Sequence, residues 1–94
     1  MNKFIQEHSS DILKNIGIAC GRARSDSGLS QQNVASLFGF TQQHISKFES
    51  GKVDSAQLLF LYLTYLPNCK AIMDYIMKVY EGMMNSAKID KSSD

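Results

Sequence analysis

A cluster of polar side chains near the middle of the chain has the types and spacing suited to contacting nucleic-acid bases. At about 100° per residue, Gln43, Ser46 and Lys47 fall on one side of a short helical segment, with Gln42 at its N-terminal end. A glutamine amide offers a donor and an acceptor, which match the N6–H and N7 groups of adenine, and Lys47 suits guanine or a phosphate. By themselves these residues fit a solvated polar face better, so the surrounding elements must decide.

Catalysis is not indicated, because the chain offers no nucleophile beside a base, no paired carboxylates and no Gly-rich phosphate loop. The six glycines are interpreted as helix ends. Cys20 and Cys69 lie far apart, and His8 and His44 do not supply the close spacing of a zinc site. Both cysteines are therefore interpreted as small apolar core residues, with a disulfide disfavoured. No metal, cofactor or small-molecule ligand is expected.

Residues 29–51 predict two short helices joined by a tight turn. Ser30 is a good N-cap for the first helix, which should stop at Gly39 because glycine adopts the left-handed conformation of many C-caps. Thr41 is the N-cap of the second helix, which ends at Glu49-Ser50-Gly51. Apolar positions follow at helical spacing, namely Val34, Leu37 and Phe38 in the first helix and Ile45 and Phe48 in the second.

An earlier helix should precede this pair. Residues 1–8 have weak patterning and are interpreted as an N-terminal arm, and Ser9-Ser10-Asp11 is a plausible N-cap region. The helix should end at the polar turn of residues 25–28. Its apolar face consists of Ile12, Ile16, Cys20 and Ala23.

Two helices should follow, so that residues 9–85 form one all-α domain of five helices. Asp54 or Ser55 caps the fourth, in which residues 58–66 are apolar nearly all round and need cover from a further helix or a partner chain. Residues 68–85 form the fifth, and residues 86–94 are interpreted as a flexible tail. The fifth helix repeats apolar residues at spacings of three and four, namely Ile72, Tyr75, Ile76, Val79, Tyr80 and Met83.

Length and composition limit the number of domains and the kinds of partner that the chain can have. The 94 residues, 44% of them hydrophobic, suffice for one core and not for two. No apolar run is long enough to span a bilayer and no signal peptide precedes the domain, which favours a cytoplasmic location without a membrane partner. The net charge is only +1, but residues 1–52 carry six basic against four acidic side chains, so any attraction to phosphate lies in that half.

Residues 22–66 resemble the helix-turn-helix of the Cro and phage-repressor (XRE-like) family. The resemblance is carried by several positions together, namely Gln31, Ala35, Gly39, Ile45, Ser46, Phe48, Glu49 and Gly51. Thr41-Gln42-Gln43, with Ile45 and residues 49–52, is especially similar to the recognition helix of the lambdoid repressors. The chain departs from the family after Gly51, where Asp54-Ser55 replaces the usual proline.

The resemblance implies a lambda-repressor-like fold whose second helix-turn-helix helix lies in the major groove of double-stranded DNA. Arg24 would pair with Glu49 and fix the angle of that helix. The base contacts implied are Gln42, Gln43, Ser46 and Lys47. The backbone contacts implied are Gln31, Arg22, Thr41, His44 and Lys52.

The function expected is that of a sequence-specific transcriptional regulator, a homodimeric repressor on an inverted-repeat operator. The excess apolar surface of the last two helices would join the copies through Tyr75, Ile76, Val79 and Met83. A controller protein of a restriction-modification system and the antitoxin of a toxin pair remain alternatives. The alternative from another class is a protein-interaction module without DNA binding, which the near-neutral charge favours.

Overall fold

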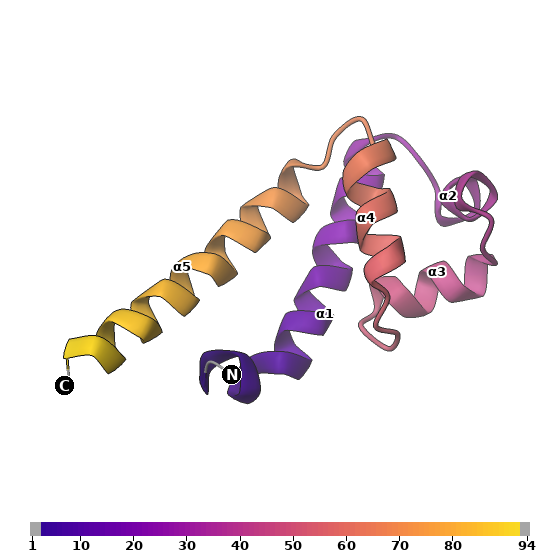
Figure 1. Ribbon diagram of the computed structural model, residues 1–94. Coiled ribbons are helices and arrows are strands. Elements are labelled where there is room, and N and C mark those ends of the chain that lie inside the picture. The colour runs from indigo at the N-terminus through magenta and orange to yellow at the C-terminus, as the bar shows by residue number, and fades with distance from the viewer. Residues whose placement is uncertain (1–2, 93–94) are drawn as a thin grey trace.

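The computed structural model describes the backbone of residues 3–92 and the side chains of residues 11–85. Within that part the secondary structure consists of five helices and no strand, which confirms the all-α prediction. These helices are α1 (Lys3–Asp26), α2 (Gln31–Phe38), α3 (Gln42–Glu49), α4 (Ala56–Tyr65) and α5 (Lys70–Ser92). In Figure 1, α1 and α4 stand between α5 on one side and the α2–α3 pair on the other. None of the described helices is long and apolar enough to cross a membrane.

Local capping signals set the ends of the short helices as predicted. The Ser30 and Thr41 hydroxyls accept hydrogen bonds from backbone N–H groups in the first turns of α2 and α3. Gly39 ends α2 in the left-handed conformation, at φ 77°. Ser55, one of the two candidates, caps α4 and accepts from the Leu58 N–H.

The long helices differ from their predicted bounds. Helix α1 begins at Lys3 and not near Ser9, so the backbone of residues 3–8 belongs to the helix and does not form a separate arm. Helix α5 begins at Lys70 and extends to Ser92, past the predicted boundary at residue 85. The side chains of both segments lie outside the described residues.

The core sits where α1 meets the other helices. Helix α1 contacts α3, α4 and α5, and α2 contacts α3. The largest fully buried side chains of the core come from all five described helices, namely Tyr62, Phe48, Ile45, Leu58, Ile72, Val34 and Cys20. Both cysteines are free thiols, Cys20 buried and Cys69 half-buried against the core, as their interpretation as core residues requires.

Two glycines let α3 approach α1 closely. Gly17 and Gly21 lie inside α1, so the prediction that all glycines mark helix ends was wrong. A Cβ on Gly17 would lie 2.6 Å from the backbone oxygen of Glu49, and one on Gly21 would lie 3.0 Å from the Glu49 side chain. The C-terminal end of α3 is therefore seated on a bare stretch of the α1 backbone.

Candidate nucleic-acid interface

The N-terminal ends of α2 and α3 lie side by side and bring two predicted contact residues together. The Gln42 Nε2 group donates a 3.0 Å hydrogen bond to Oε1 of Gln31. Both residues are the first of their helices, directly after the caps Ser30 and Thr41. An amide pair is thus held at the point where two helix termini with free N–H groups meet, which is a favourable place for an anion such as phosphate.

A carboxylate at the other end of α3 anchors this pair. Glu49 accepts hydrogen bonds from Nε and Nη2 of Arg24, at 2.8 and 3.0 Å, in a bidentate ion pair. The Arg24 and Glu49 side chains are only 17% and 7% exposed, which confirms the predicted, largely buried pair. Gln31 Nε2 donates to the same carboxylate at 3.1 Å. Arg24 also donates to the carbonyl of Leu29, so it ties the segment before α2 to α1.

A fourth donor to this carboxylate comes from α4 and was not predicted from the sequence. The Tyr62 hydroxyl, from α4, donates a 2.7 Å hydrogen bond to Oε2 of Glu49. Tyr62 is fully buried, with its ring 5.7 Å from that of Phe38 and 5.4 Å from that of Phe48. In an apolar stretch a tyrosine reads as core, and its hydroxyl partner lies 13 residues away, so no local spacing could have indicated the bond.

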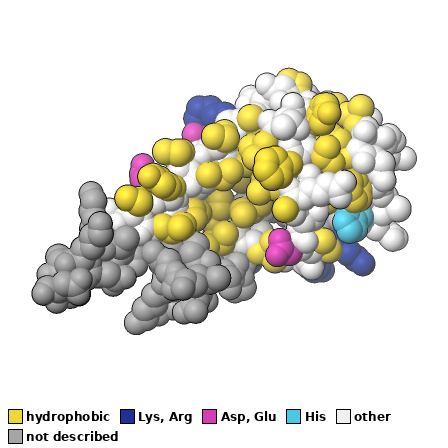
Figure 2. Space-filling view, in the orientation of Figure 1, with side chains coloured by type: hydrophobic (Ala, Val, Ile, Leu, Met, Phe, Trp, Pro, Cys, Tyr) yellow, Lys and Arg dark blue, Asp and Glu magenta, His cyan; other side chains and the backbone are white. Residues whose placement is uncertain are grey.

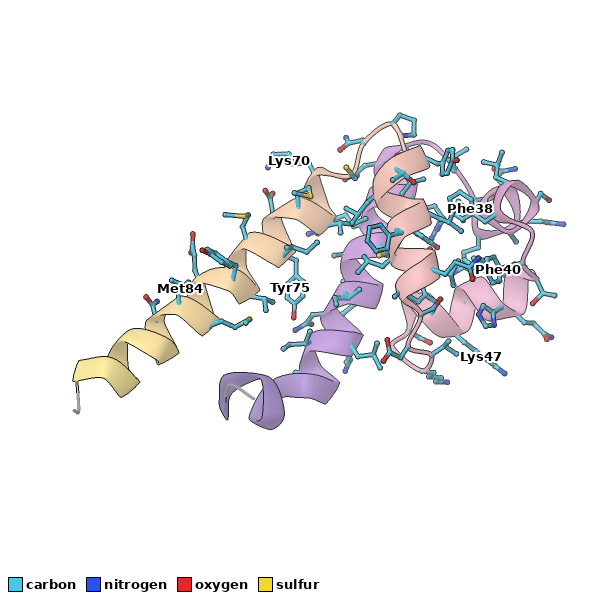
Figure 3. The ribbon with its side chains drawn as sticks, viewed as in Figure 1. Phe38, Phe40, Lys47, Lys70, Tyr75 and Met84 are labelled. Carbon is cyan, nitrogen blue, oxygen red and sulfur yellow. The ribbon has the colours of Figure 1, made fainter. Side chains whose placement is uncertain are left out.

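The outer face of α3 carries the predicted base-contacting residues, which are exposed: Gln42, Gln43, Ser46 and Lys47. In Figure 3, Lys47 points away from the core. Half-buried His44 stacks on Phe40, with ring centroids 5.2 Å apart and planes 14° apart. This contact fixes the imidazole beside the exposed face, and only the spacing of four residues hinted at it. Thr41 and Lys52, two predicted backbone contacts, are exposed at the two ends of α3.

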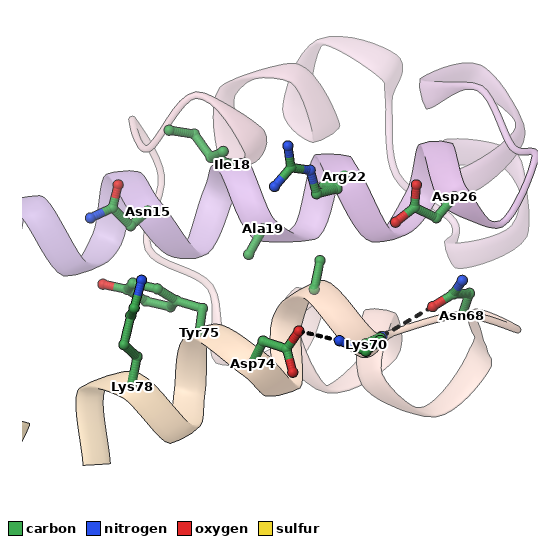
Figure 4. Close-up of a pocket in the computed structure, with 11 residues that line it drawn as sticks. Asn15, Ile18, Ala19, Arg22, Asp26, Asn68, Lys70, Asp74, Tyr75 and Lys78 are labelled. Atoms are coloured by element: carbon green, nitrogen blue, oxygen red, sulfur yellow. Dashed lines mark hydrogen bonds and ion pairs between the residues drawn. The ribbon is translucent and has the colours of Figure 1, made fainter. Parts of the chain in front are cut away.

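Arg22 does not join this face. It lines, from the α1 rim, an open groove of about 540 Å³ between α1 and α5, together with Asp26, Asp74, Tyr75 and Lys78 (Figure 4). The prediction of Arg22 as a DNA-backbone contact is therefore not supported by its position. Its neighbour Arg24, two residues on, points to the opposite side of α1 because successive helical positions turn by about 100°.

The predicted dimer-contact residues are partly covered within a single chain. Tyr75, Ile76, Val79 and Met83 are partly buried on the side of α5 that faces the rest of the chain, and Figure 3 shows Tyr75 between α5 and α1. Tyr75 and Ile76 pack on the core cluster. A second apolar stripe on α5 is exposed instead, consisting of Met73, Met77, Tyr80 and Met84.

The pKa values of three groups near Glu49 are raised, two of them mainly by burial. Burial, with a smaller contribution from the Glu49 charge, raises the pKa of the Cys20 thiol to about 12. Burial, and then the hydrogen bond to Glu49, raises the pKa of Tyr62 well above its usual range. The bond to Glu49, partly opposed by burial, raises the pKa of Arg24. Tyr62 and Arg24 therefore remain protonated donors at neutral pH.

No group of three or more histidine, cysteine, aspartate or glutamate side chains is placed to hold a metal ion within the described part of the chain. In Figure 2, hydrophobic side chains gather over α5 and α4, and Lys and Arg side chains lie both toward α3 and beside α5. Comparison with models of protein families, with curated proteins and with solved structures finds no match for this chain.

Proposed function

We propose that this chain is a sequence-specific DNA-binding transcriptional regulator of the Cro and phage-repressor type, in which α2 and α3 act as a helix-turn-helix. The observation that carries the proposal is the Gln31–Gln42 pair at the joined N-terminal ends of α2 and α3. Exposed Gln43 and Lys47 continue the same polar surface along α3. A rigid element that displays amides and a cation in this way fits the major groove.

In this proposal Gln42 and Gln43 read bases, with Ser46 and Lys47 beside them. Gln31, Thr41, His44 and Lys52 contact the DNA backbone, and the Arg24–Glu49 pair holds α3 at its angle to α1. The polar surface carries few charges, so base contacts rather than phosphate attraction would supply much of the discrimination.

The proposed regulator acts as a homodimer, because one module of this size contacts too few base pairs for selective binding. The exposed stripe of α5 has residues at spacings of four, three and four, which read the same in both directions. An antiparallel, two-fold pairing would therefore set Met73 against Met84, and Met77 against Tyr80, of a second copy. Burial of this surface would stabilise the dimer by about 25 cal/mol per Å².

Selection of bound sequences from a random duplex pool tests the proposal. The expected product is an inverted repeat with half-sites centred about ten base pairs apart. On that duplex, Gln42→Ala or Gln43→Ala should weaken binding by about 1–3 kcal/mol while random duplex binding is unchanged. Enrichment of no sequence, or equal losses on both duplexes, would contradict the proposal.

A protein-interaction module without DNA binding is the second candidate function. It is favoured by the exposed apolar side chains of α2 and α4, among which Leu37, Phe60 and Tyr65 are 67%, 67% and 71% exposed. The net charge of +1 is also low for a nucleic-acid binder. Retention on random duplex at low salt, lost as the salt concentration rises, distinguishes the DNA-binding function from this one.

A further inference from the structure

We propose that Glu49 and Tyr62 are positioning residues that set which end of the Gln42 amide faces outward. The inference rests on the proposed DNA-binding function only in its last step, the effect on base discrimination. The earlier steps concern a chain of hydrogen bonds inside the protein, which runs from the core to the outer face of α3.

The chain starts at a carboxylate whose oxygens have different partners. Oε2 of Glu49 accepts from the Tyr62 hydroxyl at 2.7 Å and from Arg24 Nε at 2.8 Å. Oε1 accepts from Arg24 Nη2 at 3.0 Å and from Gln31 Nε2 at 3.1 Å. Helices α1, α2 and α4 thus all donate to the last residue of α3.

The direction of each following bond is dictated by this carboxylate. An ionised carboxylate only accepts hydrogen bonds, so Gln31 must turn its nitrogen toward Glu49. Its oxygen then faces Gln42, which must present its own nitrogen, in the 3.0 Å bond to Gln31 Oε1. Gln42 is left with its oxygen and one N–H for an external partner.

The flipped orientation of the amides is disfavoured at Gln31, beside the buried Glu49 carboxylate, and not at the exposed Gln42. A flipped Gln31 amide would set its carbonyl oxygen against the Glu49 carboxylate and lose a charge-assisted hydrogen bond, which favours the observed orientation roughly tenfold or more. Gln42 is exposed and could rotate freely without this partner. The orientation of the Gln42 amide is therefore set by Glu49 through the hydrogen bonds of Gln31.

Tyr62 helps to hold the plane of the Glu49 carboxylate. Its ring is enclosed between Phe38 and Phe48, so the hydroxyl cannot follow a moving carboxylate. Together with the bidentate Arg24 pair, this hydroxyl holds the carboxylate plane so that one oxygen faces Gln31. Without it, Arg24 alone holds that plane, which removes one restraint on the Gln31 amide.

The consequence concerns an adenine partner. The free oxygen and remaining N–H of Gln42 match the N6–H donor and N7 acceptor of adenine in one orientation. A Gln42 amide held in advance in that orientation avoids part of the ordering entropy of binding. Tyr62, which lies in the core and does not face DNA, would then influence the base preferred at the Gln42 position.

The first test needs no DNA. In ¹⁵N-edited NMR spectra of the full chain, the exposed Gln43 side-chain amide serves as an internal reference for a free glutamine. The Gln42 amide should differ from it in chemical shift and in rotation rate. Gln31→Ala should move the Gln42 signals to the Gln43 values, and Tyr62→Phe should move them part of the way. Tyr65→Phe, which removes the hydroxyl of a 71% exposed tyrosine, is the matched control and should leave them unchanged.

Gln42 and Gln43 signals that coincide in the unmodified chain, or Gln42 signals that ignore Gln31→Ala, would overturn the hydrogen-bond chain. Because Gln31→Ala removes no fully buried side chain, this outcome can be measured even if Tyr62→Phe fails to fold. The second test uses the selected duplex, with the base at the Gln42 position changed. Gln31→Ala and Tyr62→Phe should each reduce the discrimination between the two duplexes about three- to tenfold.

Failure of the proposed DNA-binding function can be distinguished from failure of the proposed positioning role. An unmodified protein that binds no duplex would remove the proposed function, while the amide signals would still decide the internal chain. Unchanged discrimination in Gln31→Ala, with the unmodified protein binding selectively, would overturn the positioning role alone.

Discussion

Gly17 on α1 lies in contact with the backbone at Glu49, the last residue of α3. A Cβ at Gly17 would be 2.6 Å from the Glu49 oxygen and 2.7 Å from that of Phe48, which is closer than real Cβ contacts come. The seat of α3 on α1 thus depends on the absence of one methyl group. This seat also positions the Glu49 carboxylate among its donors.

Gly17→Ala should destabilise the fold by about 1–3 kcal/mol, because backbone atoms must move to admit the methyl group. This loss is expected even though helix propensity alone favours alanine over glycine by about 1 kcal/mol. Gly21→Ala is the comparison variant and should cost less, since its Cβ would meet side-chain rather than backbone atoms, the nearest being Oε1 of Glu49 at 3.0 Å. Urea unfolding measures both, and a Gly17→Ala protein as stable as the parent would disprove the tight seat.

Arg24→Met should lower the free energy of unfolding by about 3–5 kcal/mol, because it leaves the Glu49 carboxylate buried without its cation. The exposed Arg22→Met is the control for loss of an arginine from α1 and should change stability little. A triple variant with Arg24→Met, Glu49→Leu and Tyr62→Phe removes the charges and the orphaned hydroxyl together, and should recover part of the loss. An unchanged melting temperature in Arg24→Met would contradict the pair's importance.

Lys47→Ala should weaken binding to DNA of any sequence if the lysine contacts phosphate, and should reduce the slope of log affinity against log salt by about 1. Arg22→Ala should leave that slope unchanged, because Arg22 lies in the α1–α5 groove. Titrations by fluorescence anisotropy at several salt concentrations measure both variants. A larger effect of Arg22→Ala than of Lys47→Ala would place the DNA beside the α1–α5 groove and would contradict a DNA contact through α3.

Met77→Asp with Tyr80→Asp should convert the proposed dimer to a monomer, because it places charges in the centre of the exposed α5 stripe. Ile18→Asp is the control, since Ile18 is an equally exposed apolar residue on α1, at 54%. Sedimentation at micromolar concentration reports the mass. A monomeric parent protein, or a dimer that survives the double change, would rule out this interface.

The raised pKa of Cys20 predicts loss of stability at alkaline pH. In the folded chain the thiol keeps its proton up to about pH 12, whereas unfolded cysteine ionises near its ordinary pKa of 9.0. The stabilisation is complete below pH 9 and falls as the pH rises toward 12, by at most about 1.4 kcal/mol per pH unit. Tyr62 adds a loss of the same sign above its ordinary pKa of 10.0.

Urea unfolding between pH 8 and 10 isolates the cysteine contribution, because Tyr62 begins to contribute only at the upper end of that range. Cys20→Ala should flatten the fall in stability there, whereas Cys69→Ala, which retains Cys20, should keep it. An equal fall in the parent and in Cys20→Ala would assign the pH dependence to other groups.

The sequence by itself determined the short helices and their ends. Ser30, Thr41 and Ser55 cap helices through hydroxyls that reach N–H groups within three residues, and Gly39 ends α2 through its own backbone freedom. Such signals act within one helical turn, so they are readable without a fold. The Arg24–Glu49 pair was also predicted, through the resemblance, and the structure forms it.

Only the tertiary structure decided which apolar stripe of α5 is covered. The stripe of Ile76 and the stripe of Tyr80 both repeat at helical spacing, so periodicity cannot distinguish them. The angle at which α5 docks on α1 covers the first and exposes the second. The same docking places Arg22 in the α1–α5 groove.

The hydrogen bonds to Glu49 required the fold for the same reason. Arg24, Gln31 and Tyr62 lie 25, 18 and 13 residues from Glu49, on three different helices. Their side chains meet because α3 is seated on the bare backbone of Gly17, and no local pattern encodes a contact between four helices. Residue types fixed what these groups can donate and accept, whereas the packing of the helices decided which of them share one carboxylate.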